Sequence, residues 1–340
     1  MADNKVRWGI LSTARIGQKR LIPAIQKSKN GMVTSVASRD KGKAKSFARE
    51  MGIPHPVGSY EELLASNEVD VVYIPLPNSL HKEWTIKAAE AGKHVLCEKP
   101  MGLDPDEVKS MIAAAKASDV KLMEAFMYRF HPQTEKIIQM VRGGEIGKLR
   151  AIQSAFAFRL NNWNDIRYNP KLGGGSLMDV GCYCVNICRT ITGSEPVTVY
   201  AFANWAPTGV DELMIANLVF PDGVLAQFTC GFVLDRSQYY QVMGTDGTIA
   251  LTMGAFLSGS RDIHIQGQKK GETIDLKIPG ADEYQLMVEH FSDCIQNDSP
   301  VRYGAEDAAA NMQVIKALLR SASRNGQPEV INSTRALEFD

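Results

Sequence analysis

The feature that most constrains the fold is a regular alternation of two patterns in the first third of the 340-residue chain. Short apolar runs that end in turn residues alternate with longer segments whose apolar residues recur at helical spacing. The runs predict strands at 6–11, 33–37, 69–74, 94–97 and 122–125, and the segments between them predict helices at 15–27, 41–50, 80–91 and 105–118. Strand–helix units of this length pack as a parallel sheet with helices on both faces.

The pattern changes after about residue 150. Longer alternating or aromatic-rich runs predict strands at 151–158, 197–203, 213–220, 224–232, 240–244 and 263–266, and helical spacing recurs at 176–192, 284–296 and 305–321. Pro221-Asp222-Gly223 predicts a hairpin turn. We therefore predict an α/β chain with two domains. A doubly wound parallel sheet occupies 1–126, and an α+β domain with a large, mostly antiparallel sheet occupies 127–340.

Length and charge limit the class of protein. The chain is long enough for two cores. Lys plus Arg and Asp plus Glu both number 38, so no net charge favours nucleic acid or an anionic membrane as a partner. The sequence contains no apolar run long enough to cross a bilayer and begins without an apolar signal core. We therefore expect a cytoplasmic protein, although a removed leader stays open.

The six cysteines lie in apolar segments, which predicts buried, reduced thiols. Cys182, Cys184 and Cys188 follow one another closely, but they form no C-x-x-C pair and have no neighbouring His. This spacing does not fit a tetrahedral metal site, and we predict no metal.

The turn after the first strand is the first candidate for a ligand site. A dinucleotide-binding (Rossmann) fold places small residues here, where the backbone approaches pyrophosphate and a helix begins. The usual G-x-G-x-x-G has become Ser-x-Ala-x-x-Gly at 12–17. An ordinary strand–helix turn is the alternative. The predicted cofactor contacts in this turn are Ser12, Thr13, Ala14, Arg15 and Ile16.

The end of the second strand bears on the choice of cofactor. NAD enzymes place an acid there for the ribose 2′-hydroxyl. This chain has Ser38 and Arg39, followed by Lys43 one turn later. A hydroxyl and two cations suit a 2′-phosphate, which favours NADP(H). Asp40 would reverse this preference if it faced the ribose in place of Arg39.

Three motifs make the chain resemble a known family. They are Pro-Asn-Ser-Leu-His at 77–81, Gly-Lys-His-Val-Leu-Cys-Glu-Lys-Pro-Met at 92–101 and Gly-Gly-Gly-Ser-Leu-Met-Asp-Val-Gly-Cys-Tyr at 173–183. They resemble the glucose–fructose oxidoreductase / inositol dehydrogenase / MocA (Gfo/Idh/MocA) family over about residues 6–324. Within it the chain is most similar to the NADP-linked sugar and dihydrodiol dehydrogenases. The resemblance implies a homodimer or homotetramer that associates through the C-terminal sheet.

Lys99 follows the fourth predicted strand, at the edge where α/β sheets place ligands. Pro100 keeps Lys99 out of helical geometry, and a cis peptide before it is chemically allowed. The family resemblance implies that Glu98 and Lys99 lie near the nicotinamide. It also implies that the Lys99 ammonium contacts the substrate and stabilises a developing alkoxide.

Asp179 and Tyr183 are four residues apart on a predicted helix, so they share one face. The resemblance implies that Tyr183 exchanges a proton with the substrate oxygen and that Asp179 binds and orients the substrate. Ser176-x-x-Asp179 is also a capping box, with Gly193 as a plausible helix stop. The two roles of Asp179 are compatible.

Other residues are secondary candidates. Pro77, Asn78 and His81 follow the third strand and are predicted cofactor contacts, with capping or core packing as the alternative for His81. Arg129 and Trp163 are predicted substrate contacts, and Arg167 is a predicted contact of the cofactor phosphate. A solvated loop is the alternative for Trp163 and Arg167.

These features together predict an NADP-dependent oxidoreductase that transfers hydride between the nicotinamide and a sugar CH–OH or carbonyl carbon. Oxidation of an aldose at C1 to a lactone is favoured. Other readings within enzymes are a keto-sugar or dicarbonyl reductase, a trans-dihydrodiol dehydrogenase, and a glucose–fructose oxidoreductase with tightly bound NADP. A non-catalytic NADP-binding regulator is the alternative of another class. Apolar residues of the second sheet, such as Val219, Leu225 and Phe228, would need cover from a partner subunit.

Overall fold

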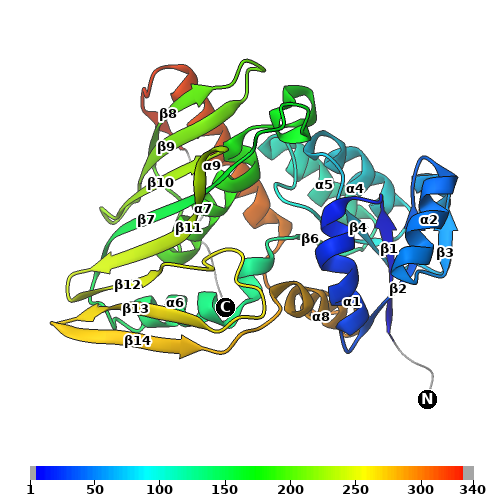
Figure 1. Ribbon diagram of the computed structural model, residues 1–340, viewed down its shortest axis with the longest axis horizontal. Coiled ribbons are helices and arrows are strands. Elements are labelled where there is room, and N and C mark those ends of the chain that lie inside the picture. Colours follow the sequence, from blue (N-terminus) through cyan, green and yellow to red (C-terminus); the bar gives the residue numbers. More distant parts are fainter. Residues whose placement is uncertain (1–4, 332–340) are drawn as a thin grey trace. The chain divides into compact units, whose positions relative to one another are not determined.

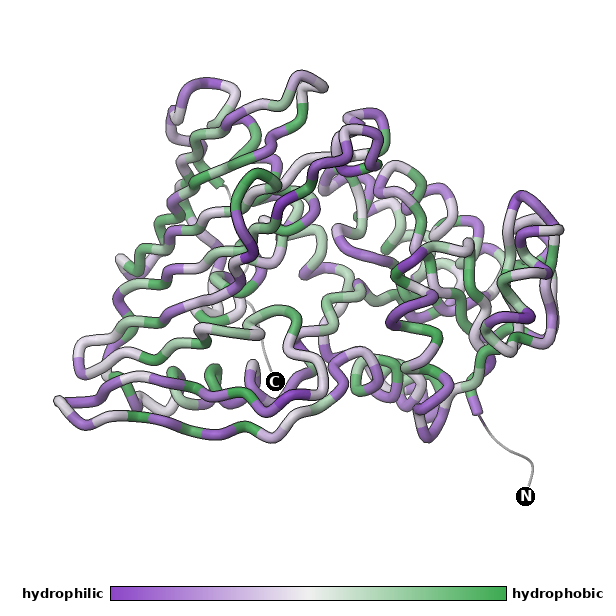
Figure 2. The backbone as a smooth tube through the Cα atoms, in the orientation of Figure 1, coloured by the Kyte–Doolittle hydropathy of each residue, from purple (hydrophilic) through white to green (hydrophobic). Residues whose placement is uncertain are grey.

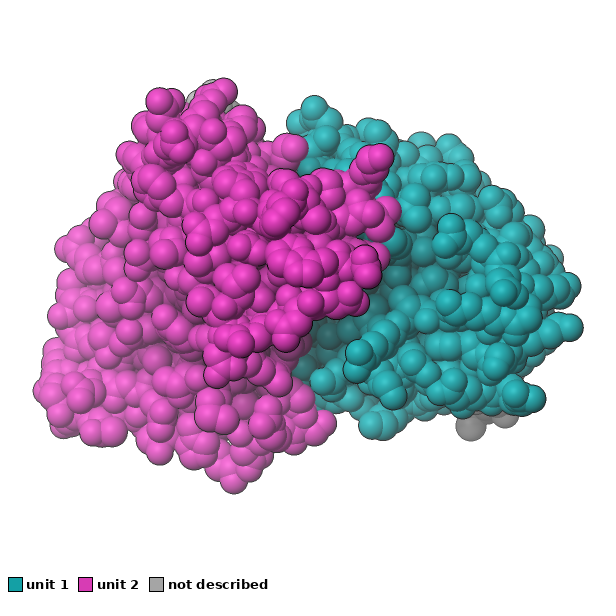
Figure 3. Space-filling view, turned by 45° about the horizontal axis from the view of Figure 1, so that its top comes forward, with its two compact units in different colours: residues 1–127, 282–309 teal, residues 128–281, 310–340 magenta. Residues whose placement is uncertain are grey.

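The computed structural model describes residues 5–331, which divide into two compact units (Figure 3). The first unit contains 5–127 and 282–309, and the second contains 128–281 and 310–331. The predicted boundary near 126 therefore lies close to the first point at which the chain passes from one unit to the other. The predicted division, however, assigned 282–309 to the second domain, whereas these residues pack with the first. Among the described residues, no helix combines the length and apolar character that a membrane crossing requires.

The first unit contains a six-stranded parallel sheet (Figure 1). Its strands are β1 Val6–Leu11, β2 Gly31–Ala37, β3 His55–Val57, β4 Val71–Ile74, β5 His94–Cys97 and β6 Leu122–Glu124. The strand order is β3-β2-β1-β4-β5-β6. The order reverses between β1 and β4, and the crevice at the carboxyl ends beside such a reversal is where open α/β sheets bind ligands.

Helices cover both faces of this sheet. They are α1 Ile22–Lys27 after a π turn at Gly17–Leu21, α2 Lys41–Met51, α3 Tyr60–Leu64, α4 His81–Glu90, α5 Pro105–Ala117 and α8 Glu283–Gln296. Trp8 on β1 contacts Phe291 of α8, with ring centroids 6.1 Å apart. A Cβ built on the next residue, Gly9, would lie 2.8 Å from Leu63 of α3. Successive strand residues point to opposite faces, so α8 and α3 lie on opposite sides of the sheet.

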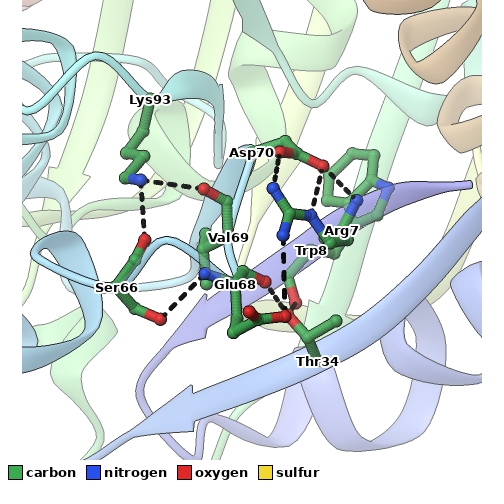
Figure 4. Close-up of polar contacts among 8 residues, drawn as sticks. All are labelled: Arg7, Trp8, Thr34, Ser66, Glu68, Val69, Asp70 and Lys93. Atoms are coloured by element: carbon green, nitrogen blue, oxygen red, sulfur yellow. Dashed lines mark hydrogen bonds and ion pairs between the residues drawn. The ribbon is translucent and has the colours of Figure 1, made fainter.

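Polar contacts at the amino ends of β1 and β4 hold these neighbouring strands together (Figure 4). The Asp70 carboxylate accepts hydrogen bonds from the backbone N–H of Arg7 at 2.9 Å and from its Nε at 3.0 Å. Burial raises the pKa of Asp70, but the contacts with Arg7 outweigh burial and leave this pKa below its ordinary value. These charges lie at the sheet edge opposite the candidate ligand site, so we assign them a structural role.

The second unit contains a nine-stranded sheet in the order β14-β13-β12-β11-β7-β10-β9-β8-β15. Its strands are β7 Leu149–Arg159, β8 Thr198–Trp205, β9 Asp211–Val219, β10 Leu225–Gly231, β11 Val233–Gly244, β12 Gly247–Leu251, β13 Ile263–Lys269, β14 Glu272–Ile278 and β15 Glu329–Val330. Its helices are α6 Pro132–Arg142, α7 Cys182–Thr192 after a π turn at Leu177–Gly181, and α9 Ala305–Ser323, whose first residues belong to the first unit. The β7–β10 pair is parallel and the other pairs between described strands are antiparallel, which confirms the predicted fold class.

The two faces of the nine-stranded sheet differ in burial. The π turn at Leu177–Gly181 and α7 pack on β7 and β10. Hydrophobic and hydrophilic residues both occur along the strands of this sheet (Figure 2), and exposed and buried residues alternate at 225–228 of β10. Leu225 is 55% exposed and pairs with Val219, whereas Phe228 is buried. The prediction that Phe228 would need cover from a partner subunit was therefore wrong, because the side chains at 225 and 228 point to opposite faces of the sheet.

All six cysteines are free and buried, which confirms the prediction of packed thiols.

Candidate active site

The turn after β1 has the backbone shape that dinucleotide motifs give to glycine. Ser12 has a φ of 111°, in the region that glycine favours. Its N–H donates to Ala37 O at 3.0 Å, and its Oγ accepts from Ala14 N at 3.2 Å and donates to Pro75 O at 3.4 Å. The serine therefore adopts the tight turn with the help of its own hydroxyl. All five residues predicted to contact the cofactor here, 12–16, lie at the carboxyl end of β1.

At the end of β2, one carboxylate is already engaged. Asp40 is the N-cap of α2, and its side chain accepts a hydrogen bond from Lys43 N at 3.0 Å. Ser38 is buried, whereas Arg39 and the Lys43 side chain are exposed. The hydrogen bond to Lys43 N directs the Asp40 carboxylate toward the N-terminus of α2 and not toward a ribose. The cationic side chains of Arg39 and Lys43 lie beside this carboxylate in the sequence. These residues fit a dinucleotide with a 2′-phosphate.

The segment after β5 carries Glu98 and Lys99 and is held by its neighbours in the sheet. The Lys99–Pro100 peptide is cis. Tyr73 of β4 donates a hydrogen bond to Glu98 Oε1 at 2.5 Å. Met101 N donates to Glu124 Oε1, at the end of β6, at 2.7 Å. Burial and the neighbouring Glu98 carboxylate both raise the pKa of the Tyr73 phenol, which therefore stays a proton donor.

His81 joins two loops of this edge and is fully buried. Its ring nitrogens lie 2.9 Å from Pro100 O and 2.8 Å from Leu76 O. Burial lowers its pKa, and the hydrogen bonds to the two carbonyls oppose this shift, because carbonyl oxygens accept only from N–H groups. Both nitrogens are occupied by backbone carbonyls, so the structure supports the core role for His81 over direct cofactor contact. Pro77 and Asn78, which begin the short helical turn before α4, remain partly exposed at the carboxyl end of β4.

In the second unit, aromatic rings surround Tyr183. Its centroid lies 5.3 Å from Phe156 on β7, 5.6 Å from Phe256 and 5.8 Å from Tyr128. The Tyr128 hydroxyl donates to Asn186 Oδ1, one turn further along α7, at 2.6 Å. Rings packed in this way fix the orientation of the Tyr183 phenol.

Asp179 lies in the π turn before α7 and forms an ion pair. Arg167 Nε donates to Asp179 Oδ2 at 2.7 Å, and Arg167 Nη1 donates to Asp165 Oδ1 at 3.2 Å. The charge of Asp179 is the largest cause of the raised pKa of Arg167. The structure thus brings two predicted site residues together. The predicted contact between Arg167 and a cofactor phosphate stays a prediction.

The two predicted substrate contacts differ in burial. Arg129 is buried, whereas Trp163 is 52% exposed. The Trp163 ring lies against Tyr168, with centroids 4.5 Å apart and planes 36° apart. Trp163 therefore has one supported face, as a platform for a sugar ring would require.

The predicted capping box at 176–179 was wrong. The Ser176 side chain makes no cap bond. Its Oγ donates instead to Asp211 Oδ2 at 2.6 Å, and Leu177 N donates to the same oxygen at 2.7 Å. A carboxylate from β9 therefore takes the place that the local motif assigned to Ser176. The predicted stop is confirmed, because Gly193 ends α7 in the left-handed conformation.

Asp211, Tyr73 and Glu124 are the site neighbours that the sequence analysis missed. Each acts on a segment far away in the chain, and none lies in a recognisable motif. Glu98 and Lys99 belong to the first unit, and Asp179 and Tyr183 to the second. Their action on one substrate stays a prediction.

Two family models match the chain. The model described as "Oxidoreductase family, NAD-binding Rossmann fold" matches 6–126, and the model described as "GFO/IDH/MocA C-terminal domain" matches 134–250.

Individual relatives cover almost the whole chain. A D-xylose 1-dehydrogenase (NADP(+)) from Haloferax volcanii is 38% identical, over 95% of this chain and 99% of its own. The crystal structure of an aldose-aldose oxidoreductase from Caulobacter crescentus, complexed with glycerol, has a TM-score of 0.89 at 28% identity and covers 96% of this chain and 100% of its own. A 3-ketoreductase from Actinomadura kijaniata, in complex with NADP and TDP-benzene, has a TM-score of 0.88 at 28% identity and covers 94% of this chain and 98% of its own.

Proposed function

We propose, since this chain belongs to the GFO/IDH/MocA family of oxidoreductases, that it is an NADP-dependent dehydrogenase that oxidises an aldose at C1 to the lactone. The chain is an oxidoreductase with a nicotinamide-binding Rossmann domain. NADP(H) is its cofactor, as in the NADP-linked xylose dehydrogenase and the NADP complex of the ketoreductase. The choice of an aldose is supported by the names of the xylose dehydrogenase and the aldose-aldose oxidoreductase.

The proposed chemistry assigns one task to each residue. Tyr183, acting as the phenolate, accepts the proton of the C1 hydroxyl and becomes the phenol, and the Lys99 ammonium stabilises the negative charge that develops on the C1 oxygen. Asp179, held by Arg167, accepts a hydrogen bond from a sugar hydroxyl and orients the ring. Trp163 provides the surface on which the sugar stacks. When bound, the nicotinamide supplies the acceptor for the hydride that leaves C1.

The observation that carries the cofactor preference is the bond between the Asp40 carboxylate and Lys43 N. It engages the one acid that could read a ribose 2′-hydroxyl, and it leaves Arg39 and the Lys43 side chain to bind a phosphate.

Fluorescence-monitored titration with NADPH and NADH tests this preference. The wild type is expected to bind NADPH more tightly, and Arg39→Ala is expected to lose about tenfold or more of this affinity with little change for NADH. Lys45→Ala removes an exposed cation elsewhere on α2 and serves as the matched control. Equal affinity for the two cofactors in the wild type would refute the 2′-phosphate site.

A sugar screen with NADP⁺ tests the substrate class. We expect lactone formation from xylose or glucose, and a loss of kcat of at least about a hundredfold in Tyr183→Phe with NADPH binding retained. Turnover of a keto-sugar or a trans-dihydrodiol, but not of aldoses, would move the assignment within the family. Tight NADPH binding without turnover of any substrate would favour the non-catalytic regulator.

Reduction of a keto-sugar is the second candidate. It is supported by the structural similarity to the 3-ketoreductase, whose complex contains NADP and TDP-benzene. A glucose–fructose type of exchange with tightly bound NADP would show itself as cofactor that survives gel filtration.

A homodimer or homotetramer is the proposed assembly. The exposed face of the nine-stranded sheet carries Phe202, Ile215 and Leu225, which are 60%, 45% and 55% exposed. Phe202 and Ile215 are directly paired on β8 and β9. A second copy of the chain would cover these residues. The free, buried thiols also support the expected cytoplasmic location.

A further inference from the structure

We propose that Asp211 is a positioning residue for the reaction, because its carboxylate fixes the first turn of the helical segment that carries Asp179 and Tyr183. The inference rests on the proposed function, which assigns the chemistry to those two residues. It concerns contacts within the second unit only.

The contacts of Asp211 make it the N-terminal anchor of this segment. It is 2% exposed and lies at the start of β9, 34 residues from the turn that it holds. Its Oδ2 accepts one hydrogen bond from Ser176 Oγ at 2.6 Å and another from Leu177 N at 2.7 Å. A Cβ built on Gly175 would collide with Asp211 Oδ1, so the glycine at this position makes room for the carboxylate.

The anchor is close to the proposed chemistry along the chain. Asp179 lies two residues after Leu177, and Tyr183 follows the same π turn. A negative charge at the N-terminus of a helix is favourable, and a buried charge with two donors fixes a backbone more tightly than a neutral group does. Displacement of this turn by a fraction of an ångström would misplace both side chains relative to a bound sugar.

Protonation distinguishes this arrangement from an ordinary buried contact. Burial raises the pKa of Asp211 to about 6. The groups that face it are the Ser176 hydroxyl, the backbone amides of Leu177, Ser176 and Asp211 itself, and the Cys230 thiol on β10, whose Sγ lies 3.7 Å from Ser176 Oγ. Burial and the charge of Asp211 raise the pKa of Cys230, so the thiol stays neutral when Asp211 titrates. As the pH falls through about 6, Asp211 loses the charge that holds the turn.

Asp211→Asn tests the proposal, because it keeps the shape of the side chain and removes the charge. We expect kcat to fall about tenfold while the KM for NADP⁺ and the affinity for NADPH stay unchanged. The wild type should show an acid limb in kcat/KM near pH 6 that the variant lacks. Glu212→Gln removes a carboxylate from the adjacent position of β9 and should behave as the wild type. A variant with the rate and pH profile of the wild type would overturn the proposal.

Hydrogen exchange of the amides at 176–183 separates this proposal from the proposed function. At about pH 5 the wild-type amides, corrected for intrinsic rates, should exchange about tenfold faster than at about pH 8, and the variant should show fast exchange at both. This result would support the anchor even if no sugar were turned over. Slow exchange in Asp211→Asn at both pH values would refute it, whatever the substrate.

Discussion

Single residues of this chain resolve questions that local motifs leave open. Asp40 follows a strand where an acid would indicate NAD, and its carboxylate caps its own helix. Ser176 and Asp179 have the spacing of a capping box, but the cap comes from Asp211. In both cases the deciding quantity is the hydrogen bond that a carboxylate already makes, which the residue type alone does not reveal.

His131 should make stability depend on pH. It is fully buried at the N-cap of α6, where Nδ1 accepts from Gln133 N at 3.1 Å, and burial lowers its pKa from 6.5 to about 4. The pKa of His131 is lower in the folded protein than in the unfolded chain, so its contribution to stability is fully present above about pH 6.5. This contribution is lost as the pH falls from about 6.5 to about 4. The difference between the two values corresponds to about 3 kcal/mol.

His131→Asn tests this pH dependence, because Asn retains an acceptor for the cap. Urea unfolding between about pH 7 and pH 4 should show that the wild type loses up to about 3 kcal/mol more than the variant. His55→Asn, at an exposed position, should follow the wild type. Parallel curves for wild type and His131→Asn would contradict the expectation.

Helix ends in this protein are set by backbone conformation as well as by side chains. Gly193 ends α7 with a φ of 66°, and a Cβ at this position would meet no atom within 4 Å. Gly193→Ala should therefore destabilise the protein by about 1 kcal/mol through its backbone alone. Gly193→Asn should cost less, because Asn tolerates this conformation. Equal losses in urea unfolding for the two variants would contradict this account.

Strong local periodicity explains which elements were predictable. The bounds of β1 and β5 are as predicted, and α5 ends one residue before its predicted end. The apolar patterns of these three elements are clear. β3 has only three residues, too few to show a period, and was not predicted. β14 was not predicted either, although Ile274, Leu276 and Ile278 alternate with polar residues along it. The helix α6 was also missed, although Ile137 and Met140 are buried at helical spacing and Pro132 is its first residue.

The position of candidate site residues in the fold could be predicted best where they directly follow strands. The turn at 12–16 and the pair Glu98–Lys99 come directly after β1 and β5, and the topology of a parallel sheet places such residues at one edge. The contacts of Tyr73, Glu124 and Asp211 join segments that are 23 to 34 residues apart. No periodicity or spacing rule connects residues at such separations.

At the scale of the whole molecule, the exposed face of the nine-stranded sheet should decide the assembly. Light scattering at about micromolar concentration should give the mass of a dimer or tetramer for the wild type, because a partner subunit would cover the exposed apolar residues of this face. Phe202→Arg together with Leu225→Arg should give a monomer that still binds NADPH. Met32→Lys changes an exposed apolar residue of the other sheet and should leave the mass unchanged. A monomeric wild type would refute the assembly.

The segment 282–309 has a consequence for synthesis on the ribosome. Trp8 on β1 donates to Ser292 Oγ at 3.3 Å, and Asn30 donates to Asp293 Oδ1 at 2.6 Å. The ribosome therefore completes all six parallel strands well before it synthesises α8, which shares one face of their sheet with α1. More than 150 further residues are translated between the two segments of the first unit, and during that time its sheet lacks the cover of α8. A late segment of the chain thus completes the unit that begins at the N-terminus, and a fragment that stops at residue 127 would lack α8 and its share of the core of this unit.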